Sequence, residues 1–267
     1  MAVLGAAAGG AFPQLTITQS QTWVPPQDGN ICIHVVGAGG GGRAATNACH
    51  SGGAGAYGKI PTLAVTTSGS FTLVVGNGGA VGTGAGGASG NGGAGGSSSI
   101  SGTGLTGTKT CGGGGPGINA SNGAGGSVSG SGESWAGYSG GAGVSNGGGA
   151  VGIYATGQAG QGTYADNAGG MTDAQSGGLA MSGYGIICGG SQPSVSQYLM
   201  TGYKNYPIQG DDLCGGGAVY YSSTNGWMYS ASGGIGGGGG GCRGTSTANV
   251  YAGAGGDGII LIQYLPW

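Results

Sequence analysis

The residues most suggestive of chemistry are glycines in the stretch "HVVGAGGGGR". Gly37, Gly39 and Gly42 have the G-x-G-x-x-G spacing of a dinucleotide-binding loop. Such a loop needs a helix directly after the glycines and an acidic residue about 20 positions further on. Here "RAATNACHSGGAG" follows, and no acidic residue occurs between Asp28 and Glu133. We therefore interpret the motif as a product of composition and predict that no cofactor is bound.

Other catalytic patterns lack their structural context in the same way. "GYSGG" and "GVSNG" match G-x-S-x-G, but neither stands between an apolar strand and a helix, as a nucleophile elbow requires. Two acidic pairs, Asp211 with Asp212 and Asp166 with Asp173, are the candidates for paired catalytic carboxylates. Solvated loop acids are the favoured reading of both pairs, so the sequence predicts a protein that is not an enzyme.

The six cysteines admit two readings. No two of them are closer than 17 residues, so the close pairs that usually bind structural zinc are absent and no metal site is predicted. Four of them adjoin glycines, as in "KTCGGGG" and "GGCRG", which fits small buried apolar residues. The even number equally fits disulfides in a protein that acts outside a cell, with no pairing specified.

The composition favours an ordered chain that binds neither nucleic acid nor a membrane interior. Of 267 residues 77 are glycine and only 4% are charged, but 37% are hydrophobic, unlike a typical disordered chain. Five Lys and Arg residues are too few for a phosphate-binding surface. No apolar run approaches the roughly 20 residues of a membrane span. The first residues, "MAVLGAAAGGAF", lack the positive start of a signal peptide and are interpreted as a retained segment.

Both ends of the chain have the alternation and turn residues of β-structure. In "ICIHVV", Ile31, Ile33 and Val35 should share one face and Cys32, His34 and Val36 the other. "GIILIQY" (258–264) is apolar on both faces and is predicted to be a central strand. "KIPTLAV" and "SFTLVV" flank "TTSG" and are predicted to pair as a hairpin.

Between these strands, glycine recurs at every third position. Examples are Gly84, Gly87, Gly90, Gly93 and Gly96, and the series Gly114, Gly117, Ala120, Gly123 and Gly126. A polyproline II chain has three residues per turn and no internal hydrogen bonds, so every third residue lines one edge. If that edge is glycine, neighbouring chains can approach and bond to one another. We predict a bundle of polyglycine II-type helices, with "GGIGGGGGGCRG" (233–244) among its most enclosed members.

Aromatic residues gather in the intervals between the glycine tracts, surrounded by Ser, Asn and Gly. This mixture is typical of recognition surfaces, because Tyr and Trp give rigid contact area while the small polar residues adapt. Covering the edges of the bundle is the alternative role for these side chains. The candidate contact residues are Trp135, Tyr138, Tyr154, Tyr164, Tyr198, Tyr203, Tyr206, Tyr221, Trp227 and Tyr229.

Three segments carry a resemblance to a known family. "WVPP" with "ICIHVVGAGGGG", then "FTLVVGNGG", and finally "GAGGDGIILIQY" resemble the glycine-rich domain of phage tail-fibre proteins. The alternation of glycine tracts and aromatic loops is similar to the distal-tip adhesins of T-even-like phages. The resemblance implies a sandwich of polyglycine helices whose loops bind bacterial surface receptors. Those adhesins carry a helical attachment domain before the bundle, whereas this chain enters β-structure within about 15 residues.

The predicted fold is all-β and irregular, with almost no α-helix, in a single domain. N- and C-terminal strands (15–75 and 245–267) should form a β-sandwich-like base. Residues 76–244 should form the polyglycine bundle with its aromatic loops, and residues 1–14 are a candidate attachment segment.

The expected function is that of a virion protein, a tail-fibre tip adhesin. Its partners would be a bacterial outer-surface receptor, protein or glycan, and other phage tail or capsid proteins that contact the base or the N-terminal segment. An oligomer is compatible with this expectation. A structural virion component, such as a capsid decoration or fibre subunit, is the alternative. A glycan-degrading enzyme using Asp211 and Asp212 is the second alternative.

Overall fold

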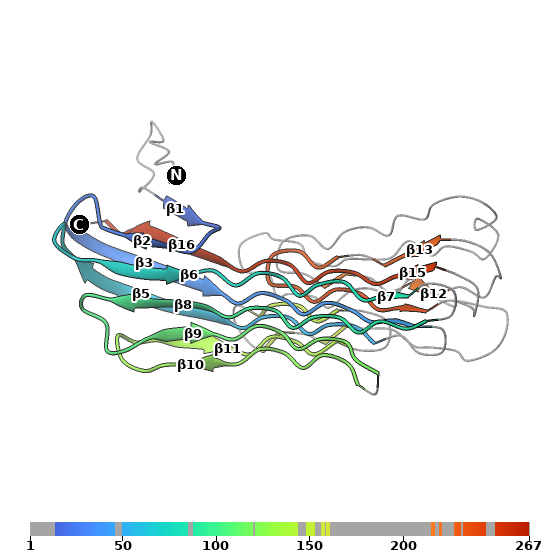
Figure 1. Cartoon of the computed structure of the whole chain (residues 1–267). Coiled ribbons are helices and arrows are strands. Elements are labelled where there is room, and N and C mark those ends of the chain that lie inside the picture. Colours follow the sequence, from blue (N-terminus) through green and yellow to red (C-terminus); the bar gives the residue numbers. More distant parts are fainter. Residues whose placement is uncertain are drawn as a thin grey trace.

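The computed structural model shows an elongated molecule with a β-sandwich at one end and glycine-rich segments running away from it (Figure 1). The residues that the structure describes contain no α-helix, and therefore no helix that is long and apolar enough to cross a membrane. The described residues are 14–45, 50–84, 88–119, 121–143, 148–152, 156–157, 159–160, 215–216, 219–220, 227–230, 232–243 and 249–266.

The sandwich, which we call the base, consists of two five-stranded antiparallel sheets. The first sheet has the order β1 (Gln14–Ile17), β16 (Ile259–Tyr264), β3 (Gly29–Val36), β5 (Tyr57–Val65) and β11 (Ala136–Tyr138). The second has the order β10 (Val128–Ser129), β9 (Lys109–Cys111), β8 (Ser98–Gly102), β6 (Phe71–Val74) and β2 (Gln21–Trp23). The predicted all-β fold with a β-sandwich base is confirmed.

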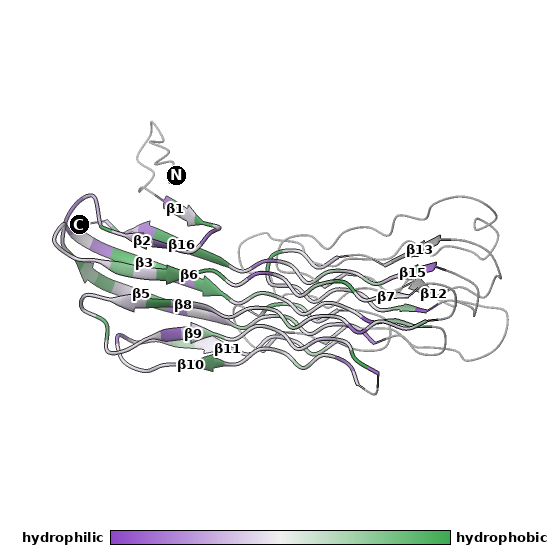
Figure 2. Cartoon of the chain, viewed as in Figure 1, coloured by the Kyte–Doolittle hydropathy of each residue, from purple (hydrophilic) through white to green (hydrophobic). Residues whose placement is uncertain are grey.

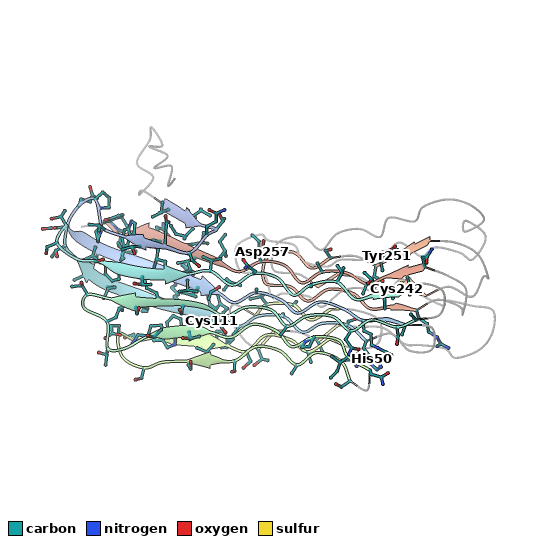
Figure 3. The ribbon with its side chains drawn as sticks, in the orientation of Figure 1. His50, Cys111, Cys242, Tyr251 and Asp257 are labelled. Carbon is teal, nitrogen blue, oxygen red and sulfur yellow. The ribbon has the colours of Figure 1, made fainter. Side chains whose placement is uncertain are left out.

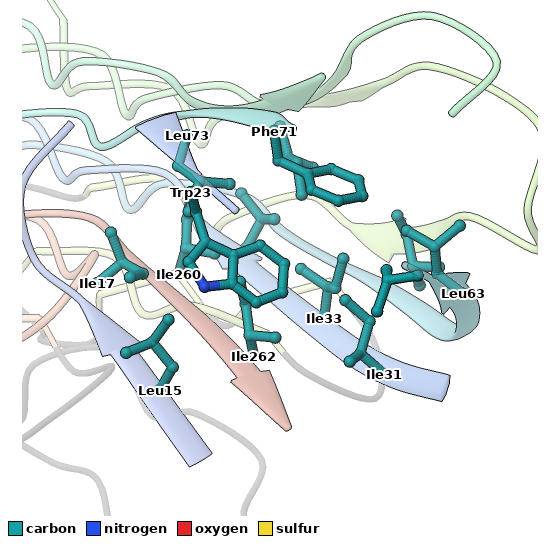
Figure 4. Close-up of a cluster of buried hydrophobic side chains, with 14 of the residues drawn as sticks. Leu15, Ile17, Trp23, Ile31, Ile33, Leu63, Phe71, Leu73, Ile260 and Ile262 are labelled. Carbon is teal, nitrogen blue, oxygen red and sulfur yellow. The ribbon is translucent and has the colours of Figure 1, made fainter. Parts of the chain in front are cut away.

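The core of the base lies between the two sheets. Ile31, Ile33 and Val35 of β3 are fully buried in it, which confirms the predicted inward face. From the second sheet, Phe71 fills the core with its ring centroid 5.5 Å from that of Trp23 (Figure 4). Strand β16 lies between β1 and β3, so the prediction of a central strand near the C-terminus is also confirmed.

The predicted hairpin between 59–65 and 70–75 is wrong. Strand β5 pairs with β3 and β11 in the first sheet, whereas β6 pairs with β2 and β8 in the second. The connection, in which Gly69 N–H donates to the Thr66 carbonyl, therefore crosses from one sheet to the other. Both strands carry alternating inward apolar residues, and this alternation suits a sandwich as well as a hairpin.

Base strands and glycine segments interleave along the chain. Strand β3 continues directly into 37–44, and 51–56 leads back into β5. Strands β8 to β11 lie within 98–138, although the sequence analysis assigned the base to 15–75 and 245–267. Figure 2 shows the strongly apolar residues concentrated in the base, with the glycine segments near neutral. A bundle whose members alternate in direction must return to the base repeatedly, which explains the interleaving.

Residues 37–44, the glycine stretch of the apparent dinucleotide motif, have a hydrogen-bond pattern that repeats every three residues. The N–H groups of 37, 40 and 43 donate to the carbonyls of 56, 53 and 50. The N–H groups of 38, 41 and 44 donate to the carbonyls of 96, 93 and 90. The N–H groups of 39 and 42 donate to the carbonyls of 256 and 253. All N···O distances are 2.7–3.0 Å. This three-residue period is what a polyproline II-type conformation requires.

The same segment also accepts hydrogen bonds, so that six others surround it. It donates to 50–56, 90–96 and 253–258, and it accepts from 76–82, 112–117 and 236–242. Adjacent members of this ring are bonded to each other, for example Gly95 N–H to the Gly114 carbonyl. The stretch is thus the centre of a hexagonal arrangement, enclosed by protein on every side, which explains the glycines without a cofactor.

A second segment, 51–56, has six neighbours in the same way. Two of them, 112–117 and 236–242, are shared with the first ring, and 37–44 is a third. The others are 122–127, 139–143 and 148–152. Residues 236–242 are all buried, in agreement with the prediction that 233–244 is an enclosed segment.

Candidate binding end of the bundle

The bundle has an end opposite the base, which we call the far end. Segments 37–44 and 76–82 continue base strands outward, whereas 51–56 and 90–96 lead back to base strands. The described chain therefore reverses direction at the far end after each outward segment (Figure 1). Connections held on a rigid scaffold are where binding residues are most often found, which makes this end the candidate site.

Two small three-stranded sheets organise the far end. One consists of β12 (Val219–Tyr220), β14 (Cys242–Arg243) and β4 (Ala44–Ala45), all parallel. The other consists of β13 (Trp227–Tyr229), β15 (Asn249–Tyr251) and β7 (Thr83–Gly84). The buried side chains of Ala44, Cys242, Val250 and Ala252 pack between them. This cluster fixes the two sheets against each other.

Polar side chains join glycine segments near the far end. Arg43 Nη2 donates to Asn119 Oδ1 at 2.7 Å, and the Ser51 N–H donates to Asn122 Oδ1 at 3.3 Å. Ser51 Oγ accepts from the Gly241 N–H at 2.8 Å. Figure 3 shows His50 in the same region, where burial lowers the pKa of the imidazole and the Asn122 hydrogen bond partly opposes this. Each of these bonds ties segments distant in sequence, so the far end is held in one arrangement.

The described cysteines are buried free thiols. These are Cys32, Cys111 and Cys242. Burial raises the pKa of Cys242 to about 12 and raises that of Cys111 as well, so neither is a thiolate at neutral pH. These three cysteines are therefore small buried residues and do not form disulfides with one another. Cys49, Cys188 and Cys214 lie outside the described residues. No group of three or more His, Cys, Asp and Glu residues suited to a metal occurs in the described part.

The structure separates the predicted contact residues into two places. Trp227 and Tyr229 belong to β13 at the far end, whereas Trp135 and Tyr138 belong to the base (Figure 1). The remaining candidates, which are Tyr154, Tyr164, Tyr198, Tyr203, Tyr206 and Tyr221, lie outside the described residues, as do Asp211 and Asp212.

Trp135 has a structural environment in the base. Its side chain is half-buried against the hydrophobic core, its Nε1 donates to the Ser129 carbonyl at 3.2 Å, and its ring lies over Gly58. Tyr138 is 38% exposed on β11, the edge strand of its sheet. Tyr138 is therefore an exposed tyrosine remote from the far end, which makes it a suitable control for substitutions at the far end.

The base contains a buried lysine in an ion pair that the sequence does not signal. The Lys109 side chain is fully buried; its ammonium pairs with Glu133 and donates to the carbonyls of Thr106 and Ser131. The Lys109 hydrogen bond holds the pKa of Glu133 at about 2, aided by those from Thr106. Nothing in "GTKTC" signals a buried lysine, because two of its partners, Ser131 and Glu133, come from a turn more than twenty residues away.

A second polar cluster lies on the outer face of the first sheet and predicts a pH dependence. His34 Nδ1 is 2.7 Å from Tyr57 Oη, and Nε2 is 3.4 Å from Cys32 Sγ. Burial, with a smaller effect of Lys59, lowers the pKa of His34 to about 4. Since the unfolded chain takes up this proton near the ordinary pKa of 6.5, folding stability should be lost as pH falls from 6.5 through 4.

The expected loss in the free energy of unfolding is about 1–2 kcal/mol. This is less than the full difference between the two pKa values gives, because the His34 ring is partly exposed. Urea unfolding at pH 7 and pH 4.8 measures it. The window lies above the ordinary pKa of Glu133, 4.5, so that this carboxylate contributes little. A His34→Gln variant should show a flatter profile. An unchanged slope in that variant would assign the pH dependence to other groups.

Comparison with known proteins identifies a family but no curated relative. The sequence model of a family described as glycine-rich domain matches residues 16–265. No curated protein matches the chain.

Proposed function

The chain belongs to the glycine-rich domain family, and from this premise and its two-ended architecture we propose that it is the receptor-binding tip of a phage tail fibre. The base is the attachment end, and the connections at the far end contact a bacterial surface receptor. The resemblance of "ICIHVVGAGGGG" and "GAGGDGIILIQY" to tail-fibre domains supports the viral assignment. A virion location at the exterior of the particle follows from the same proposal.

One observation carries the proposal: the hexagonal packing holds the far end at a fixed position relative to the base. Two complete rings of six segments share members, so each inner segment is bonded on all sides. Connections anchored to such a scaffold lose less conformational entropy on binding than free loops do. The aromatic-rich intervals 196–212 and 219–230 are the contact residues in this proposal.

Adsorption to cells tests the proposal. The purified chain is labelled and titrated onto a panel of bacterial strains, and its ability to block phage attachment is scored on each. A Tyr203→Ala/Tyr206→Ala/Trp227→Ala variant should bind about 30-fold or more weakly, since the loss of even one aromatic hot-spot residue costs about 2 kcal/mol. Tyr138→Ala, which removes an exposed tyrosine from the base, should bind as the unaltered chain does.

Two results would contradict the proposal. Failure of the folded chain to adsorb to any strain that its phage infects would favour a structural virion component. Equal loss of binding in the Tyr138→Ala variant would place the contact on the base instead of the far end.

A further inference from the structure

The bundle contains a dipeptide, Asn-Gly, that is chemically unstable in flexible chains. Asn-Gly is usually a turn sequence. In this chain three of the five pairs lie inside hydrogen-bonded glycine segments of the described structure, and these are Asn77-Gly78, Asn91-Gly92 and Asn122-Gly123. Asn77 and Asn91 are exposed to water and Asn122 is half-buried. The fold therefore places a reactive dipeptide at three positions where water can reach it.

The instability arises because the backbone nitrogen of the glycine can attack the asparagine side chain. A bond forms from this nitrogen to the side-chain carbonyl carbon Cγ, the carboxamide C–N bond breaks, and the amide proton leaves with the ammonia. Water then opens the succinimide ring at either carbonyl and gives aspartate or isoaspartate. Glycine permits the attack because it has no side chain to hinder it. Each isoaspartate would add one atom to the main chain and disturb the three-residue hydrogen-bond period of its segment.

In two of the pairs, a neighbouring segment holds the N–H group that would have to react. The Gly92 N–H donates to the Gly117 carbonyl at 3.0 Å. The Gly123 N–H donates to the Ser51 carbonyl at 2.8 Å. In a polyproline II-type segment, where ψ is about +145°, the peptide plane must rotate before its nitrogen can approach Cγ. That rotation breaks the hydrogen bond, so the reaction requires local opening of the bundle.

The third pair is held by a side chain instead of a backbone carbonyl. The Gly78 N–H donates to Asp257 Oδ1 at 2.7 Å. Asp257 immediately precedes Gly258 and strand β16, and its own carbonyl accepts the Gly236 N–H at 2.8 Å, which fixes its position (Figure 3). The protection of Asn77 thus depends on one carboxylate that a substitution can remove.

We propose that Asn77, Asn91 and Asn122 are latent deamidation sites that the hydrogen bonds of the bundle keep unreacted, and that Asp257 is the group that protects Asn77. Deamidation at Asn77 would also add a second negative charge one residue from the glycine that Asp257 binds. The protection is local to each pair and independent of receptor binding.

Peptide mapping by mass spectrometry during incubation at mildly alkaline pH measures the three rates, with pepsin digestion in acid to stop the reaction. Asp257→Ala removes the acceptor of the Gly78 N–H. Asp28→Ala is the matched control, because Asp28 Oδ1 accepts a backbone N–H from Thr67 in the base. Circular dichroism establishes that both variants are folded.

We expect Asp257→Ala to raise the deamidation rate at Asn77 about tenfold, because local opening there no longer breaks a hydrogen bond to a charged group. The rates at Asn91 and Asn122 should not change, and Asp28→Ala should leave all three rates unchanged. A folded Asp257→Ala variant in which Asn77 reacts no faster would overturn the proposal. Equal acceleration at all three asparagines would also overturn it, since Asp257 would then stabilise the bundle in general.

A second comparison uses the unaltered chain and does not depend on the folding of a variant. The three rates are measured in native buffer and in concentrated urea. We expect each to be at least about tenfold slower in the folded chain, because the glycine N–H groups are released only on opening. Equal rates in the two conditions would show that the bundle gives these asparagines no protection.

Discussion

Replacing Gly40 with alanine is expected to lower the free energy of unfolding by about 3 kcal/mol or more. Gly40 lies in the central segment, where its N–H donates to Gly53 and its carbonyl accepts from Gly239, both at 2.9 Å. A Cβ at this position would collide with the Gly115 carbonyl, which itself accepts the Gly53 N–H. Because the obstacle is backbone held by several hydrogen bonds, it has no side chain that can rotate away.

Chemical unfolding followed by circular dichroism measures this change. Gly69→Ala is the matched control, since the nearest atom to its added Cβ is the Thr66 carbonyl oxygen at 3.1 Å, in a turn of the base. We expect the control to lose about 1 kcal/mol or less. Equal losses in the two variants would show that the close approach of segments around residue 40 does not determine stability.

Truncating Phe71 to alanine is the second change with a large expected effect, a loss of about 3–5 kcal/mol. Its side chain is 1% exposed and lies against Trp23, so truncation removes buried contacts and leaves a cavity between the two sheets. Val74→Ala, on the outer face of the same strand, is the control because Val74 is 39% exposed. A loss in the control as large as in Phe71→Ala would contradict the assignment of the core.

The two variants also test whether base and bundle unfold together. Strand β3 and segment 37–44 are one continuous stretch of chain, as are β9 and 112–117. A single cooperative transition in both variants would therefore be expected, with tryptophan fluorescence and circular dichroism of the whole chain giving the same midpoint.

Local sequence patterns predicted the elements of the fold better than their arrangement. Alternation in "ICIHVV" assigned the inward face of β3, and apolarity on both faces placed β16 at the centre of a sheet. The glycine phasing indicated segments that bond between neighbours. The glycine phasing did not indicate which segments are hydrogen-bonded neighbours, because one glycine contact position is chemically the same as another.

The same limitation affected the connections and the candidate site. "TTSG" has turn chemistry, but whether β5 and β6 pair or separate depends on their partners β3 and β8, far away in sequence. Trp135 and Trp227 occur in similar aromatic intervals, yet one packs on the core of the base and the other is part of a far-end strand. Composition cannot distinguish the two ends of a bundle whose segments run in alternating directions.

Hydroxyl-radical footprinting of the chain, free and adsorbed to receptor-bearing cells, tests most directly whether binding occurs at the far end. Binding at the far end should protect Trp227, Tyr229 and the tyrosines of 196–212 on adsorption. Tyr138, exposed on the base, should be modified equally in both states. Protection of Tyr138 with no change at Trp227 and Tyr229 would contradict the account and make the base the contact surface.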